Sequence, residues 1–162
     1  MNRQIKLYIL LALVGLVMAA PAAAGEFIFG VKTGTVVVDD SSVKTDPTNI
    51  GIMVGYEQSL VLGDFAIEGE LTTTTNKGEL KSGGGKFKAD TKALYAAFRS
   101  AGPFYLKAKA GFLQIDNEGN TDSGASYGVG LGFGVGVAQL ELELTRTAVD
   151  PEITFLSLGL QF

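Results

Sequence analysis

Histidine, cysteine and tryptophan are all absent from this chain of 162 residues. Without cysteine, neither disulfides nor thiolate metal sites can stabilise the fold. Without histidine, the chain lacks the side chain most often used as a general acid or base. Asp and Glu outnumber Lys and Arg by 17 to 13, so there is no basic footprint for nucleic acid. We therefore expect no nucleic-acid partner, no metal and no cofactor.

The amino-terminal segment has the layout of a secretory signal peptide. Two basic residues precede an apolar run over Leu7 to Met18, which is too short to span a bilayer as a helix. The alanines of 22–24 provide the small residues that a signal peptidase needs. We predict a cleaved signal peptide over 1–24 and one mature domain over 25–162. A retained helical anchor is the alternative.

The mature chain alternates apolar and polar residues with a period of two, and no segment has a convincing helical period. Most of the alternating segments are about ten residues long, the length that a tilted strand needs to cross a bilayer. Short turns alternate with longer polar connections, except that the last connection is short. Eight strands are expected, roughly over 26–37, 49–57, 64–75, 90–99, 104–115, 124–135, 137–148 and 152–162. The predicted fold is all-β, an eight-stranded antiparallel up-and-down transmembrane β-barrel.

Aromatic residues on the apolar face gather at the end of the barrel that carries the short turns. Alternation alone would equally suit a soluble lipocalin-like barrel with its faces exchanged, but a soluble core has no reason to sort rings to one end. The pattern is typical of an interfacial aromatic girdle. The expected girdle residues are Phe27, Phe29, Tyr56, Phe65, Phe98, Phe104 and Phe133, with Phe162 at the same end.

The opposite face combines glycine with charge, as a narrow lumen requires. Buried charges are tolerated only when they are paired, and the acidic and basic residues of this face nearly balance. The predicted lumen charge network consists of Lys32, Glu57, Glu68, Glu70, Arg99, Lys107, Lys109, Glu141 and Glu143. On a soluble barrel these residues would instead face solvent. Two carboxylate pairs in this set are formal acid–base candidates, but the nearby cations would hold them ionised, so no catalytic residue is expected.

The chain ends on a strand with Leu156, Leu158, Leu160 and the terminal Phe162 on one face. This ending resembles the last strand of bacterial outer-membrane β-barrels, which the barrel-assembly machinery reads as a signal; the edge strand of a soluble sheet is the alternative. Residues 25–162 as a whole resemble the small barrels of the OmpA transmembrane-domain, OmpX and opacity-protein type. The segments 95–99 and 104–111 also look like the central hairpin of this group. The girdle departs from the group in having Phe where Trp is usual.

The resemblance implies a location in the cell outer membrane of a Gram-negative bacterium and a non-enzymatic role. That role would be structural or a surface interaction, adhesion-like, mediated by extracellular loops. A narrow porin-like diffusion channel is the first alternative, and a soluble periplasmic lipocalin-like carrier is the second. The implied partners are outer-membrane lipid and lipopolysaccharide, the barrel-assembly machinery, and an extracellular ligand that the sequence does not identify. A monomer is expected.

We expect no specific ligand site at three features near the outer rim. Lys92 and Arg146 share the parity of the lipid-facing residues and could meet lipopolysaccharide phosphates, but we expect snorkelling positions at the rim without specific lipid binding. The basic, glycine-rich segment 76–90 is predicted to be a mobile surface loop. The acidic segment 116–122 differs from a calcium loop, because Gly stands at its fourth position and no Glu follows at the twelfth.

Overall fold

The computed structural model describes residues 25–38, 42–81, 85–117, 120–148 and 152–162. The predicted signal peptide, 1–24, lies outside the described residues. Within the described part, no helix is long and apolar enough to cross a membrane.

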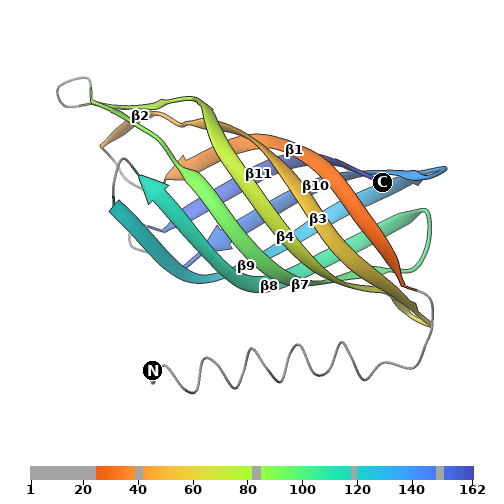
Figure 1. Cartoon of the computed structure of the whole chain (residues 1–162). Coiled ribbons are helices and arrows are strands. Elements are labelled where there is room, and N and C mark those ends of the chain that lie inside the picture. Colours follow the sequence, from red (N-terminus) through yellow and green to blue (C-terminus); the bar gives the residue numbers. More distant parts are fainter. Residues whose placement is uncertain (1–24, 39–41, 82–84, 118–119, 149–151) are drawn as a thin grey trace, which may run out of the picture.

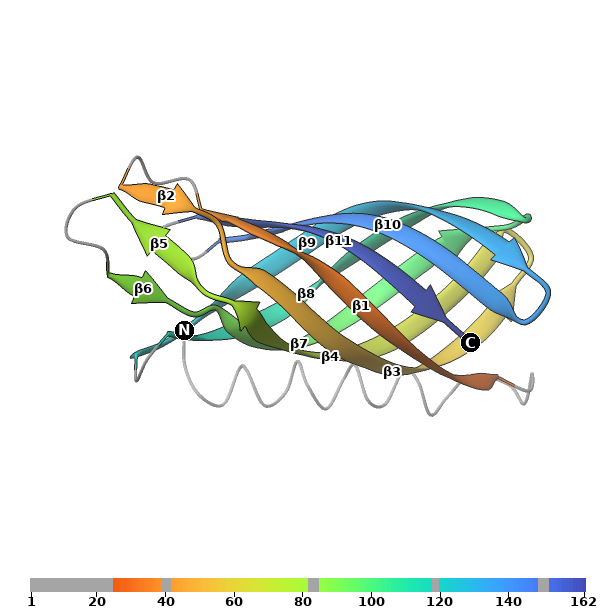
Figure 2. The ribbon, with the colours of Figure 1, turned by 90° about the horizontal axis from the view of Figure 1, so that it is seen from above.

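Eight antiparallel strands form a closed barrel, which confirms the predicted fold (Figures 1 and 2). Around the barrel the order is β1-β11-β10-β9-β8-β7-β4-β3, and β3 pairs with β1 to complete the ring. Each of the eight predicted ranges overlaps one of these strands. Their bounds are β1 Glu26–Val38, β3 Thr48–Leu60, β4 Gly63–Asn76, β7 Asp90–Ser100, β8 Phe104–Asn117, β9 Asn120–Val135, β10 Ala138–Thr147 and β11 Ile153–Gln161.

The two faces of the wall have opposite chemistry, as the period of two requires. On β10, Leu142 is 48% exposed whereas its neighbours Glu141 and Glu143 are each 4% exposed. The register continues this separation across strands, because Leu142 lies opposite Leu158 on β11. An outer wall of aliphatic and aromatic side chains is stable only against an apolar medium. The faces are therefore those of a membrane barrel, and the soluble lipocalin-like alternative is not favoured.

The two ends of the barrel differ. Tight turns join β3 to β4, β7 to β8 and β9 to β10 at one end, which we call the short-turn end (right in Figure 1). Gly136 has φ of 63° and Gly102 has φ of 116°, a left-handed conformation that L side chains rarely adopt. The connection from β8 to β9 was expected to be long but is short, because β8 runs to Asn117 and β9 begins at Asn120. The two longer connections, from β1 to β3 and from β4 to β7, lie at the opposite end, the long-loop end. There, buried apolar residues close the interior: Val36, Ala89, Leu113, Ile115 and Ile153.

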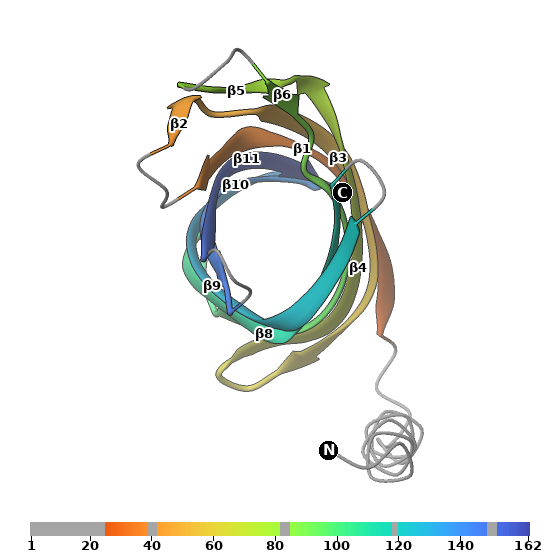
Figure 3. The ribbon, with the colours of Figure 1, turned by 90° about the vertical axis from the view of Figure 1, so that its left-hand side faces the viewer.

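A small three-stranded sheet extends the long-loop end and was not predicted. It consists of β2 (Val43–Thr45), β5 (Gly78–Leu80) and β6 (Lys86–Phe87), in the order β2-β5-β6. The expectation of a mobile loop over 76–90 is therefore wrong for part of that segment. The strands are too short for alternation to show, and β2 finds its partner far along the chain. Viewed along the barrel, the sheet lies beside the opening and does not cross it (Figure 3).

Candidate functional site

The interior of the barrel is filled by long charged side chains from six strands. All nine residues of the predicted lumen network point inward, because each occupies the inward parity of its strand. Glycines on the same face make room for them. A β-carbon at Gly130 on β9 would lie 2.9 Å from the Leu142 carbonyl oxygen and 3.2 Å from Glu143 Cγ. Because these glycines have no side chain, the charged side chains of the neighbouring strands can occupy the lumen.

Arg99 on β7 is the centre of the network at its short-turn side. Its guanidinium group is 1% exposed and donates to acceptors on four other strands. The Nη1 atom lies 2.6 Å from Glu57 Oε2 and Nε lies 2.8 Å from Glu141 Oε1. The Nη2 atom pairs with Glu68 and also lies 2.8 Å from Gln161 Oε1. The fixed fork of guanidinium donors therefore links β3, β4, β10 and β11 across the lumen.

Three lysines continue the network toward the long-loop end. Lys107 Nζ lies 3.0 Å from Glu68, 2.8 Å from Glu141 and 2.6 Å from Glu143. Lys109 Nζ lies 2.5 Å from Glu70 and 2.9 Å from Glu143, and Lys32 Nζ lies 2.8 Å and 2.9 Å from the same two carboxylates. Every one of the nine charged groups thus has at least one partner of opposite sign.

Polar residues that the sequence analysis did not single out complete the network. The Tyr105 hydroxyl lies 2.8 Å from Gln139 Oε1 and 2.9 Å from Glu141 Oε1, and its single proton can be donated to either oxygen. Lys109 Nζ lies 4.3 Å from the centre of the Tyr95 ring, a cation–π contact. These tyrosines share the inward parity of the neighbouring charges, so extending the parity argument to uncharged residues would have found them.

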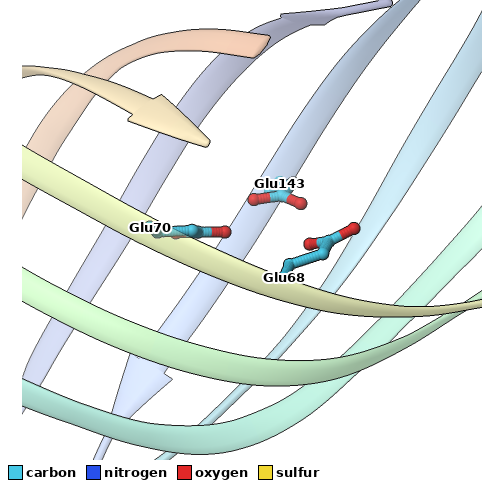
Figure 4. Close-up of side chains that lie close together, drawn as sticks. All are labelled: Glu68, Glu70 and Glu143. Atoms are coloured by element: carbon cyan, nitrogen blue, oxygen red, sulfur yellow. The ribbon is translucent and has the colours of Figure 1, made fainter. Parts of the chain in front are cut away.

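Three of the carboxylates converge, as Figure 4 shows for Glu68, Glu70 and Glu143. One oxygen from each lies within 4.8 Å of the others, which is a separation that could hold a metal ion. However, each carboxylate is already paired with an ammonium or guanidinium group, and Glu143 alone meets three lysines. The negative charge that a cation would need is thus compensated by the protein. The same pairing makes these groups poor candidates for proton transfer.

Little space remains around the charged layer. A cavity of about 30 Å³ lies on its long-loop side and one of about 20 Å³ lies beside Lys107 and Glu141. A water molecule needs roughly 10–15 Å³ of such space, so the first cavity suits about two or three waters and the second about one or two. Asn49 Oδ1 and Thr145 Oγ1 line the first cavity and have no protein partner, which fits a bound water there.

The predicted girdle residues lie on the outer surface near the short-turn end. Several of them meet in pairs: Phe27 with Tyr56 at 5.4 Å, Phe29 with Phe162 at 5.5 Å and Phe104 with Phe133 at 4.4 Å between ring centres. Phe65 and Phe98 lie opposite each other in the β4–β7 register. The rings are exposed, from 37% for Phe65 to 84% for Phe27. Such a band suits the interface between lipid and water.

The end of the chain closes the seam of the barrel. Phe162 donates its N–H to the Phe29 carbonyl at 2.8 Å and accepts from the Phe29 N–H at 3.0 Å. Leu156, Leu158 and Leu160 all face outward and are between 37% and 47% exposed. The four residues of the predicted assembly signal therefore form one apolar stripe on the surface of the last strand.

The rim residues are paired within the protein. Lys92 Nζ lies 3.6 Å from Asp116 Oδ2, and Arg146 pairs with Glu152. Asp116 also accepts a hydrogen bond of 2.6 Å from Thr121 Oγ1, which helps to join β8 to β9. The described residues of the acidic segment thus belong to β8 and β9, and 118–119 lie outside the described residues.

A family model described as an outer membrane protein β-barrel domain matches residues 9–158. No curated protein sequence matches the chain significantly. Solved structures do resemble it. The attachment invasion locus protein Ail of Yersinia pestis, crystallised with the heparin analogue sucrose octasulfate, is 18% identical with a TM-score of 0.58. That similarity covers 85% of this chain and 97% of Ail.

Two further structures have the same architecture. The outer membrane protein OprG of Pseudomonas aeruginosa is 15% identical with a TM-score of 0.60, covering 86% of this chain and 97% of OprG. Neisserial surface protein A is 11% identical with a TM-score of 0.51, covering 83% of this chain and 95% of that protein. At such identities the likeness shows the fold alone.

Proposed function

Because the chain belongs to the family of outer-membrane β-barrel domains and lies in the bacterial outer membrane, we propose that it is a non-enzymatic barrel with a closed lumen. Its role is structural or a surface interaction through the long-loop end, which faces outward in this class. The closed lumen is supported most directly by Arg99, whose guanidinium group donates four hydrogen bonds to three carboxylates and one amide from four strands. Within the part of the chain that the structure describes, each of the nine charged residues of the lumen network is paired, so none of them is left to line a water path.

The channel alternative requires these charges to separate and admit water. Liposomes containing the folded protein should therefore not swell in solutions of small sugars at a rate above that of empty liposomes. A porin of known pore size, reconstituted at the same protein-to-lipid ratio, is the positive control. Swelling comparable to that control would establish the channel and remove the closed-lumen proposal.

The surface interaction is assigned to the small sheet β2-β5-β6. Val43 lies opposite Leu80, and the other face carries Lys44 within 3.4 Å of Glu79, which lies opposite Lys86. The sheet thus has an apolar face and a predominantly basic face. Ail, which shares the fold, was crystallised with a sulfated sugar. We infer that the basic face binds an anionic polysaccharide at the cell surface.

Binding of the detergent-folded protein to an immobilised sulfated polysaccharide tests this inference. Lys88 directly follows β6 in the chain and is included in the test with the two lysines of the sheet. The triple variant Lys44→Gln, Lys86→Gln, Lys88→Gln should bind at least about tenfold less tightly at low salt, because each lysine near an anionic surface contributes roughly 1 kcal/mol. The matched Lys→Arg triple variant keeps the charge and should bind like the parent. Equal binding by the two triple variants would exclude the sheet as the interaction surface.

The proposal also covers export and assembly. Residues 1–24 are removed during secretion, and the barrel-assembly machinery recognises the stripe formed by Leu156, Leu158, Leu160 and Phe162. The folded barrel is a monomer in the membrane. The sequence pattern of 1–24 supports the cleavage, and the exposure of the stripe on β11 supports its recognition.

A further inference from the structure

The lipid-facing wall is hollowed over β3, β4, β7 and β8, in the half of the membrane nearest the long-loop end. A groove of about 570 Å³ lies there. Gly69 forms its floor: a β-carbon at this position would meet no atom closer than the Val54 carbonyl oxygen at 3.8 Å. The absence of a side chain at one outward position therefore creates the hollow, and no neighbouring residue fills it.

The walls of the groove are apolar. Val54 and Leu94, which flank Gly69 in the strand registers, are 59% and 50% exposed. Leu71 and Phe112 continue the walls and are 51% and 66% exposed. This wall faces lipid. A hydrocarbon chain in the groove would contact the protein on several sides, whereas a chain on a flat wall would contact it on one side.

The outer end of the groove is polar. Lys92, Gln114 and Ser123 line it there, and the register places Lys92 opposite Gln114 and Gln114 opposite Ser123. The Lys92 side chain is 63% exposed even though its ammonium group lies 3.6 Å from Asp116. A ligand that fits this groove has an apolar chain directed toward the membrane centre and a negatively charged group at the level of the outer headgroups.

We propose that the groove binds one acyl chain of a lipopolysaccharide molecule, with a phosphate of the same molecule at Lys92. We choose lipopolysaccharide because of the position of the cationic end of the groove. That end lies on the side of the long loops and hence in the outer leaflet, where lipopolysaccharide is the phosphorylated lipid. The site is on the outer wall and is independent of whether the lumen conducts or the small sheet binds a polysaccharide.

Native mass spectrometry of the barrel, released from its own outer membrane in mild detergent, tests the proposal. The parent should retain one lipopolysaccharide molecule per barrel. Gly69→Ile fills the groove without entering the wall and should lose that adduct almost completely. Ala108→Ile is the matched control. It enlarges a small outward-facing residue on β8, outside the groove, and should retain the lipopolysaccharide adduct.

A second pair of variants tests the charged end. Lys92→Ala should lower retention about fivefold, the equivalent of roughly 1 kcal/mol for one lysine at a lipid surface. Arg146→Ala removes a rim cation on β10, away from the groove, and should leave retention unchanged. If Gly69→Ile does not fold, as shown by the absence of a heat-dependent gel shift, the comparison of Lys92→Ala with Arg146→Ala tests the proposal without it.

Three outcomes would overturn the proposal. The first is equal retention by each variant and its matched control. The second is retention of a phospholipid in place of lipopolysaccharide by the parent. The third is a dimer mass that Gly69→Ile abolishes, which would assign the groove to a second copy of the chain.

Discussion

At the scale of single residues, the interior is stabilised by pairing and destabilised by any unpaired charge. Lys107 illustrates this, because its side chain is 2% exposed and its ammonium group meets three carboxylates from β4 and β10. A buried ion pair gains little over a well-packed apolar contact, yet removing one partner leaves a charge without compensation. The network therefore makes the chain intolerant of single changes in the lumen.

We expect Lys107→Ala to lower the free energy of unfolding by about 3–5 kcal/mol, and by less if water enters the lumen. The matched change at the exposed rim, Lys92→Ala, should cost no more than about 1 kcal/mol, because that pair is solvated. Urea unfolding in lipid vesicles measures both. The charge-swapped double variant Lys107→Glu, Glu141→Lys should not recover the loss, because residue 107 would then face Glu68 and Glu143 and residue 141 would face Arg99. Equal effects at the two lysines would contradict a dry, paired lumen.

On the outer wall, an added charge is destabilising because the side chains face lipid. Leu142 faces lipid at 48% exposure, opposite Leu158 on β11 and Leu131 on β9. An Arg near the bilayer midplane should cost roughly 2–4 kcal/mol on the lipid face. Unfolding of Leu142→Arg in a lipid bilayer gives the value, with Leu142→Met as the control for packing. A variant that unfolds like the parent would show that Leu142 does not face lipid.

At the scale of elements, the strands were predictable because lipid, lumen and strand length all impose the same period. Apolar residues alternate with polar or charged residues from Ala138 to Leu144 of β10, and this pattern located the strand and both of its faces. The sheet β2-β5-β6 was not predictable in this way. Its strands are two or three residues long, and β5 pairs with β2 across more than 30 positions of the sequence. Local alternation carries no information on such a pairing.

The last strand has two separable roles, one in the barrel seam and one in assembly. Deleting Phe162 removes its two backbone hydrogen bonds to Phe29 and one ring contact, a small part of the β1–β11 pairing. We therefore expect the truncated barrel to refold in detergent with nearly parental stability while its level in the outer membrane falls severalfold. Fractionation with quantitative immunoblotting measures that level. Equal amounts of the two proteins in the outer membrane would refute the assembly role.

At the scale of the whole molecule, parity predicted which charges enter the lumen but not which of them meet. Partners across a barrel depend on the tilt of the strands and on the shear between them. Arg99 reaches Glu57, Glu141 and Gln161, which lie 42, 42 and 62 positions away in the sequence. The lipid-facing groove was also beyond sequence reasoning, since Gly69 is an ordinary strand glycine until its neighbours are placed in space.

The central claim, a lumen closed by paired charges, is tested most directly by electrical recording from the unmutated protein in a planar bilayer. The network of Arg99, Lys107 and their carboxylates, beside which lie two small cavities of about 30 and 20 Å³, predicts no stable ion current above the bare-bilayer baseline. In the same apparatus, Lys107→Ala should produce measurable openings because it leaves space and unpaired carboxylates in the lumen. Stable, porin-sized conductance steps from the unmutated barrel would contradict the account.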